Sequence, residues 1–219
     1  MTATPIPTSA ARIRLASSWV VALAIALGLG GIVGARLFAV RAGFDPLLLG
    51  AAFGAALTAL ALAGRLPRAN GARALRSAPA GLSAHTVSSI LAGGVVGIAL
   101  VAIAVLGPAI GGVLTAPGVG RPAAPFVPWA LVTLLVAAAE EGVLRGVLFD
   151  RIERVAGLIP AIALTTIAFA LMHVPLYGWH VVPLDLAVGL VLAGLRISTR
   201  GLVAPIAAHA VADLATWWV

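Results

Sequence analysis

Long apolar stretches alternate with short polar segments along almost the whole chain. Runs such as 15–35, 46–64 and 87–107 contain no charged residue, and each is longer than the roughly 18 residues that indicate a membrane-spanning helix. Prolines, glycines and arginines separate the runs and mark the expected helix ends. The pattern predicts an all-α, polytopic bundle of about seven transmembrane helices, at residues 16–35, 44–64, 86–107, 127–155, 157–173, 183–199 and 201–218.

The composition supports a protein that has the bilayer as its solvent. Of the 219 residues, 62% are hydrophobic and 10% are charged, whereas a typical soluble domain has about 25% charged residues. The first apolar run follows Arg12 and Arg14, as in a secretion signal, but further hydrophobic segments come after it, so we expect a first anchor. The chain has no cysteine, which excludes disulfides, thiolate catalysis and Cys-ligated metals.

The net charge of +7 comes from arginines that mostly stand at the ends of the apolar runs. At such positions arginines act as topology signals and contact anionic lipids, so we expect the lipid bilayer, and no nucleic acid, as the partner. A cytoplasmic N-terminus places most arginines on the inside, which predicts a multi-pass protein of the inner (cytoplasmic) membrane with its C-terminus outside. The inside set is Arg12, Arg14, Arg65, Arg68, Arg73, Arg76, Arg151, Arg154, Arg196 and Arg200, and the outside set is Arg36, Arg41 and Arg121.

The C-terminal half also carries ionisable residues within its apolar runs. A charged residue at the middle of a membrane costs about 2.5–3.5 kcal/mol, so each such residue calls for a partner or a function. Counting about 1.5 Å per residue from the expected turns places these side chains at one level on three helices. We therefore divide the single membrane domain into N-terminal helices with a linker, 1–126, and a helical core, 127–219. The residues are Glu140, Glu141, Arg145, His173, His209 and Asp213.

The spacing of these residues predicts contacts within each helix. Glu141 and Arg145 stand at i and i+4, a geometry for an ion pair, while Glu140 is rotated by about 100° and can face another neighbour. His209 and Asp213 repeat the i, i+4 relation, so the carboxylate can accept a hydrogen bond from the imidazole and fix its tautomer.

Residues near the predicted cluster have simpler expected roles. Phe169 and His173 share a helix face, and Pro175 is expected to end their helix. Asp185 is expected to cap its helix. Asp150 and Glu153 are expected to pair with Arg151 and Arg154 at the surface.

Three motifs in this half together resemble a known family. They are Glu-Glu-x-x-x-Arg at 140–145, Phe-x-x-x-His at 169–173 and His-x-x-x-Asp at 209–213, in order on successive apolar segments. The set resembles the CPBP family of intramembrane proteases, which groups CAAX prenyl endopeptidases with bacteriocin-processing and immunity proteins. The resemblance covers about residues 127–215, and both Asn and Asp occur in the family at the position of Asp213.

The resemblance implies an endopeptidase that cleaves a peptide bond near the cytoplasmic leaflet. It assigns Glu140 as the general base that activates water, His173 as the residue that positions the water, and His209 with Asp213 as the group that binds the oxyanion. Glu141 and Arg145 would support the site. The implied substrate is a peptide or a membrane protein, with or without an attached lipid.

Other readings stay open at this point. Glu140 can be a buried acid satisfied by a neighbouring helix, Glu141 and Arg145 a structural ion pair, and Asp213 an orienting partner of His209. The whole protein can be a small proton-coupled transporter, although the sequence shows no inverted repeat, or a non-catalytic scaffold or immunity protein, although its motifs are intact. The implied mechanism requires no cofactor. Two histidines and two glutamates are nevertheless able to hold Zn²⁺, so a metal site stays open, although no His-Glu-x-x-His motif is present.

Overall fold

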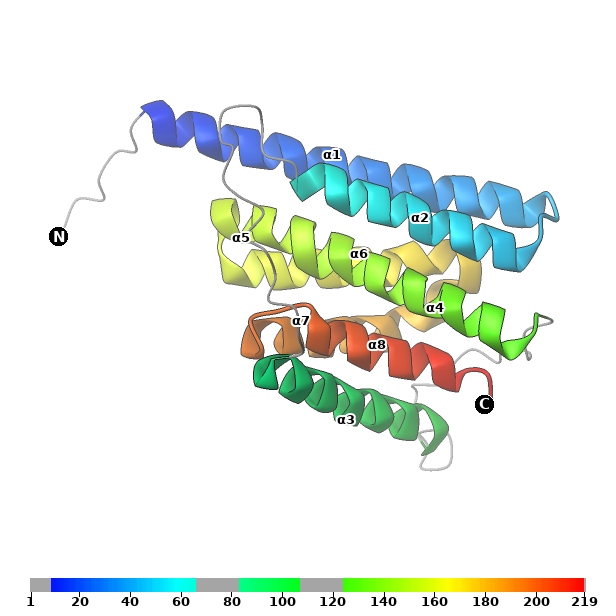
Figure 1. Cartoon of the computed structure of the whole chain (residues 1–219). Helices are drawn as coiled ribbons and strands as arrows, with labels where there is room; N and C mark the ends of the chain where they lie inside the picture. The colour runs from blue at the N-terminus through cyan, green and yellow to red at the C-terminus, as the bar shows by residue number, and fades with distance from the viewer. Residues whose placement is uncertain (1–8, 66–82, 107–123, 219) are drawn as a thin grey trace.

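The computed structural model describes residues 9–65, 83–106 and 124–218 and consists of helices that run back and forth through one bundle (Figure 1). Six described stretches are long and apolar enough to cross a membrane, and α8 is a shorter apolar helix. The predicted all-α polytopic bundle is therefore confirmed. Its elements are α1 Ser9–Arg41, α2 Pro46–Arg65, α3 Ala84–Leu106, α4 Phe126–Glu141, the π-helix η2 Gly142–Leu148, α5 Phe149–Ala156, α6 Leu158–Tyr177, the short 3₁₀ helix η3 Trp179–Val181, α7 Val182–Ser198 and α8 Val203–Ala215.

Some of the predicted topology signals cannot be placed. Arg68, Arg73, Arg76 and Arg121 lie outside the described residues, as do the side chains of Arg12 and Arg14.

Three helices differ from the prediction. The helix expected at 16–35 is longer at both ends and covers Ser9–Arg41. The single helix expected at 127–155 is divided into α4, η2 and α5, because the backbone changes to π-type hydrogen bonding after Glu141. Pro175 does not end α6, which continues to Tyr177. The proline lies in the last turn, where few hydrogen bonds remain to be broken, and the helix ends at Gly178, whose φ of 91° favours glycine.

Glycines of α2 allow this helix to pack closely on α4. A Cβ added at Gly50 would come within 2.7 Å of Val132, and one added at Gly54 within 2.8 Å of Leu135. Lipid tails are as apolar as the helix surfaces, so close van der Waals contact between small residues is a main source of attraction between membrane helices. The contact between α2 and α4 therefore supports the helix that carries Glu140.

The same principle holds α3 against α8, which lie side by side at one edge of the bundle (Figure 1). A Cβ at Gly93 would overlap the carbonyl oxygen of Ala204, and one at Gly97 would lie 2.7 Å from that of Ala208. Gly94, between them, has no atom within 4 Å of such a Cβ. The backbone of α8 is thus positioned by α3 through two glycines on one face.

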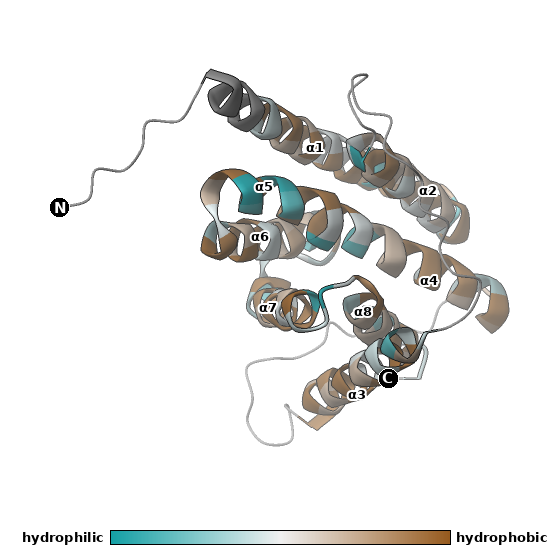
Figure 2. Ribbon diagram, turned by 60° about the vertical axis from the view of Figure 1, so that its left-hand side comes forward, coloured by the Kyte–Doolittle hydropathy of each residue, from teal (hydrophilic) through white to brown (hydrophobic). Residues whose placement is uncertain are grey.

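The two ends of the bundle differ in chemistry. At one end, Phe126 and Trp129 from the start of α4 pack on Trp217 after α8, with ring centroids 5.2 Å and 5.0 Å from that of Trp217. At the other end, α5 forms a hydrophilic patch on an otherwise largely apolar bundle (Figure 2). The aromatic contacts join α4 and α8, the two helices that carry most of the ionisable residues.

Candidate active site

Glu140 and Glu141 end α4 and lie directly before the π-helical segment. Both are buried, with 3% and 0% of their surfaces exposed. π-Type turns are rare, and they occur frequently at functional sites. The irregular backbone therefore coincides with the two acids that the sequence singled out.

Glu141 is held by two partners, Arg145 and His209, from different helices. Its Oε1 accepts hydrogen bonds from the Arg145 guanidinium and from Nδ1 of His209, each at 2.9 Å. The predicted Glu141–Arg145 ion pair is present and fully buried. Arg145 also donates to the carbonyl of Gly189 in α7, at 3.2 Å, and lies over the ring of Phe169, with its Cζ 4.6 Å from the centroid. Arg145 thereby joins η2, α6 and α7.

His209 lies among three carboxylates. Its Nδ1 donates to Glu141, while its Nε2 is 3.7 Å from Glu140 Oε2 and 3.5 Å from Asp213 Oδ2. The prediction from spacing of a hydrogen bond between His209 and Asp213 is wrong. The hydrogen bond is made by Glu141, because α4 presents its carboxylate at 2.9 Å, whereas the Asp213 side chain is 39% exposed and stays further away.

The two contacts at Nε2 are longer than hydrogen bonds. Separations of 3.5 and 3.7 Å exceed the usual N–H···O distance of about 2.7–3.2 Å, so Nε2 lies near both carboxylates without a hydrogen bond to either. His209 and Glu140 are thus buried neighbours. The equal depth of α4 and α8 predicted from residue counting agrees with this contact.

His173 lies on the same side of the bundle but has different neighbours. Its Nδ1 is 2.9 Å from the carbonyl oxygen of Phe169 and 3.5 Å from Asp185 Oδ2. A carbonyl only accepts, so Nδ1 donates and Nε2 is the accepting nitrogen of the neutral ring. The Phe169 ring contacts both imidazoles edge-on, with centroids 4.8 Å from His173 and 5.5 Å from His209. Among the described residues, His173 makes no hydrogen bond or ion pair with Glu140.

Asp185 is a neighbour of the site that the sequence assigned to a cap. The N-cap of α7 is Val181, without a side-chain cap bond, and Asp185 lies in the first turn near His173. Its Oδ2 is buried and has no hydrogen-bond partner. An acid inside an apolar helix was the only available signal, because no sequence spacing relates α7 to the histidine of α6.

Arg36 is a second neighbour that the sequence placed elsewhere, among the topology signals of the outer end. It is half-buried in α1, and its guanidinium lies 4.4 Å from the centroid of the Phe53 ring. It is within electrostatic range of Glu140 and His173. The first helix therefore contributes a positive charge to the surroundings of the site.

The donor set does not match a metal centre. In the parts of the chain that the structure describes, no three His, Asp or Glu side chains are grouped so that they could hold one ion. Glu141 is already occupied by Arg145 and His209, and His173 is turned toward Phe169 and Asp185. We therefore derive no step through a Zn²⁺ ion, and the absence of a metal requirement stays a prediction to be tested.

The arrangement can perform acid–base chemistry. It contains a buried carboxylate, Glu140, beside an imidazole whose other nitrogen is bonded to an ion-paired acid. A family model described as type II CAAX prenyl endopeptidase Rce1-like matches residues 122–215 and so includes all seven specified residues of the three motifs, together with Asp185. Comparison with curated proteins and with solved structures finds no match.

Proposed function

Since residues 122–215 match the family model of Rce1-like type II CAAX prenyl endopeptidases, we propose that the chain cleaves a peptide bond near the cytoplasmic leaflet with a water molecule activated by Glu140. The observation that carries the proposal is the proximity of two buried side chains, Glu140 and His209, whose Oε2 and Nε2 are 3.7 Å apart. A general base and a group able to stabilise developing charge then face the same reacting atoms.

In the proposed reaction, Glu140 takes a proton from the water as the water oxygen bonds to the scissile carbonyl carbon. The carbonyl oxygen becomes an oxyanion. When this intermediate collapses, the C–N bond breaks and Glu140 returns the proton to the leaving amine. The products are a carboxylic acid and an amine, and no oxidant or cofactor is consumed.

His209, protonated on both ring nitrogens, is proposed to stabilise the oxyanion through Nε2–H. Glu141, fixed by Arg145, accepts from Nδ1 and thereby orients the ring at 2.9 Å. Preorganised donors of this kind contribute strongly in a water-poor site. Asp213, 3.5 Å from Nε2, favours a proton on that nitrogen and lies at the more exposed side of the cluster.

His173 is proposed to position the water through Nε2, its accepting nitrogen. The carbonyl of Phe169 and the carboxylate of Asp185 hold the opposite side of the ring. His173 and His209 both contact the ring of Phe169, and the scissile peptide bond of the substrate is proposed to lie between the two imidazoles.

In the proposed orientation, the protein lies in the inner membrane with its N-terminus in the cytoplasm. In its support, Arg65 at the end of α2, Arg200 after α7, and Arg151 and Arg154 in α5 lie at the α5 end of the bundle. Arg41 ends α1 at the other end. The substrate is then a peptide or membrane protein that reaches the site from the cytoplasmic leaflet, with or without an attached lipid.

The test is cleavage of a panel of lipidated and unlipidated fluorogenic peptides by detergent-purified protein. Glu140→Gln keeps the shape of the side chain but removes the base, so we expect a loss of at least about 10²-fold in rate. Glu153→Gln, an exposed acid on α5, is the matched control and should cleave at the wild-type rate. A chelator should leave wild-type cleavage unchanged.

Three outcomes separate the alternatives. Cleavage by wild type that survives in Glu140→Gln would overturn the assigned base. Loss of wild-type cleavage on chelation, with recovery on adding Zn²⁺, would overturn the metal-free mechanism. If wild type is folded but cleaves no peptide in the panel, a scaffold or transporter role takes precedence.

A further inference from the structure

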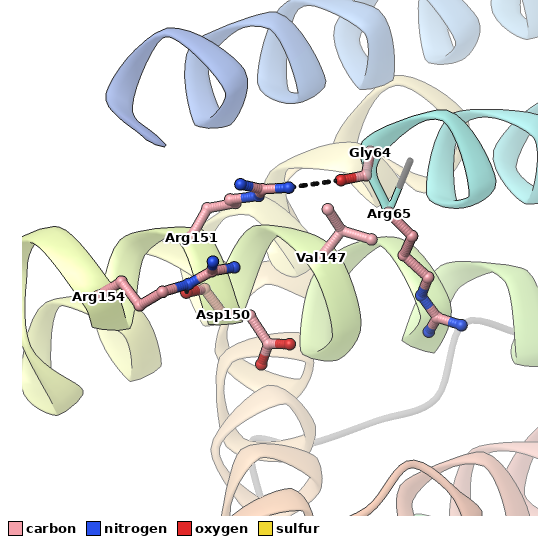
Figure 3. Close-up of a pocket in the computed structure, with 6 residues that line it drawn as sticks. All are labelled: Gly64, Arg65, Val147, Asp150, Arg151 and Arg154. Atoms are coloured by element: carbon pink, nitrogen blue, oxygen red, sulfur yellow. Dashed lines mark hydrogen bonds between the residues drawn. The ribbon is translucent and has the colours of Figure 1, made fainter. Parts of the chain in front are cut away.

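A cleft of about 230 Å³ opens at the end of the bundle where α2 finishes and α5 runs past it (Figure 3). Its volume is several times the roughly 30 Å³ that one water molecule takes up in the liquid. It lies apart from Glu140 and His209, and the proposed reaction uses none of its side chains. The lining residues are Gly64, Arg65, Val147, Asp150, Arg151 and Arg154.

The cleft has an excess of positive charge. Three of its lining residues are arginines and one is an acid. The sequence predicted that Asp150 pairs with Arg151 or Arg154, but this is wrong: its Oδ1 instead binds Arg196 of α7, at 3.1 Å. The single carboxylate of the cleft is thus shared with a fourth arginine.

Backbone carbonyls hold two of the guanidinium groups in place. Arg151 donates to the carbonyl of Gly64, at 2.8 Å, and Arg154 donates through Nε to the carbonyl of Asp150, also at 2.8 Å. Arg65 extends from the end of α2 on the opposite side of Val147 from Arg151 and Arg154 (Figure 3). The neutral carbonyl partner of Arg154 fixes the direction of its guanidinium but does not cancel its charge, and Arg65 adds a second positive charge, so the cleft is prepared for an anion.

We propose that this cleft binds a phosphate group. The planar fork of arginine matches phosphate oxygens in a bidentate manner, and a guanidinium is less strongly hydrated than an ammonium. The cleft lies at the end of membrane-spanning helices, the depth at which basic pockets bind lipid head groups. Leu62, 57% exposed one turn before the cleft, offers an apolar surface for an acyl chain. The phosphate can come from an anionic phospholipid or from free phosphate in solution.

The cleft is connected to the ionisable cluster through Arg196. This residue donates through NH2 to Asp150 in the cleft and through Nε to the backbone carbonyl of Arg145, at 3.1 Å each. An anion that orders the cleft thereby also steadies η2, the segment on which Arg145 is carried. This inference does not depend on the protein being a peptidase.

The test measures lipid binding to the intact, detergent-purified protein by native mass spectrometry and by the midpoint of thermal unfolding. Phosphatidylglycerol, phosphatidylcholine and inorganic phosphate are the three probes. The variants are Arg65→Gln and Arg154→Gln, singly and combined. Arg200→Gln is the matched control, because Arg200 is an exposed arginine at the same end but outside the cleft.

We expect wild type and Arg200→Gln to retain one phosphatidylglycerol and to show a higher unfolding midpoint with it. Each cleft variant should bind about tenfold more weakly, because a charge-assisted hydrogen bond contributes about that factor. A similar stabilisation by inorganic phosphate alone would assign the site to free phosphate. Equal weakening in the cleft variants and in Arg200→Gln would overturn the proposal, because diffuse attraction to the surface would then explain the binding. No preference for phosphatidylglycerol over phosphatidylcholine would also overturn it, because binding would then not depend on the negative charge of the lipid.

Discussion

The helix pairs α2–α4 and α3–α8 each join a helix without buried ionisable residues, here called plain, to a helix with buried ionisable residues, here called loaded. In the described part of α1 to α3, the buried polar residues are Ser18 and Ser89. In α4 to α8, buried carboxylates, a guanidinium and an imidazole occur together. The plain helices contribute glycines, which allow close packing, and the loaded helices contribute groups that are costly to insert.

This difference separates two ways of stabilising a membrane bundle. Helix α3 holds α8 by close backbone contact at Gly93 and Gly97. Helix α4 holds α8 by the hydrogen bond that His209 donates to the carboxylate of Glu141. A close helix contact tolerates little added side-chain volume, and a buried ion pair tolerates poorly the loss of one partner. Each region should therefore fail in its own way when it is mutated.

The largest effect is expected from unbalancing the charged region. Arg145→Met removes the cation beside Glu141 and leaves a fully buried carboxylate with one partner fewer, which should cost about 3–5 kcal/mol of unfolding free energy. Adding Glu141→Gln should recover part of this loss, because a neutral amide can still accept from His209. Ser89→Ala on α3 is the comparison and should cost about 1 kcal/mol or less. Equal losses for Arg145→Met and Ser89→Ala in detergent unfolding would contradict the distinction between the two regions.

Filling the glycine contact should have the next largest effect. Gly97→Leu places a side chain where α8 already lies, so we expect a loss of about 1–3 kcal/mol and a displaced His209, with slower peptide cleavage. Gly94→Leu adds the same volume to the open side of the same helix and should change neither property. The pair is compared by unfolding midpoint and by cleavage rate. If Gly94→Leu is as harmful as Gly97→Leu, the close approach of α3 and α8 is not what positions the histidine.

Removing the charge beside His173 should have a smaller effect, limited to function. Asp185→Asn keeps the side-chain shape, so we expect about tenfold lower kcat with little change in KM or in the unfolding midpoint, a typical size for a group that orients a histidine. Asp185→Glu should recover part of the rate. An unchanged kcat in Asp185→Asn would remove this residue from the proposed mechanism.

The smallest effect is expected at the start of α2. Asp45 accepts a hydrogen bond from the backbone N–H of Leu48, at 2.9 Å, so Asp45→Ala should lower stability by about 1 kcal/mol. The cleavage rate per folded molecule should not change, because this cap lies in the plain region. A selective loss of rate at constant stability would show that α2 takes part in catalysis directly.

Much of the fold followed from the sequence, because apolar length is a strong signal for membrane helices. The helix positions, the ion pair of Glu141 with Arg145 and the common level of α4 and α8 were all predictable from spacing. The partner of His209 was not. Spacing along one helix identified Asp213, whereas the three-dimensional packing brought in Glu141 from another helix. Asp185 was misassigned for the same reason, because its relation to His173 exists only between helices.

The π-helical segment Gly142–Leu148 also determines the direction about the helix axis in which the side chains after it point. Each of its turns uses more residues than an α-helical turn, so the residues after it are rotated relative to those of α4 compared with an uninterrupted α-helix. Deleting one residue within it would turn the following helix by roughly 100°. Arg151 and Arg154 would then no longer face the end of α2, although Glu140 would keep its place. The segment works as a spacer that allows one continuous transmembrane span to direct its acids inward and its arginines toward a separate cleft.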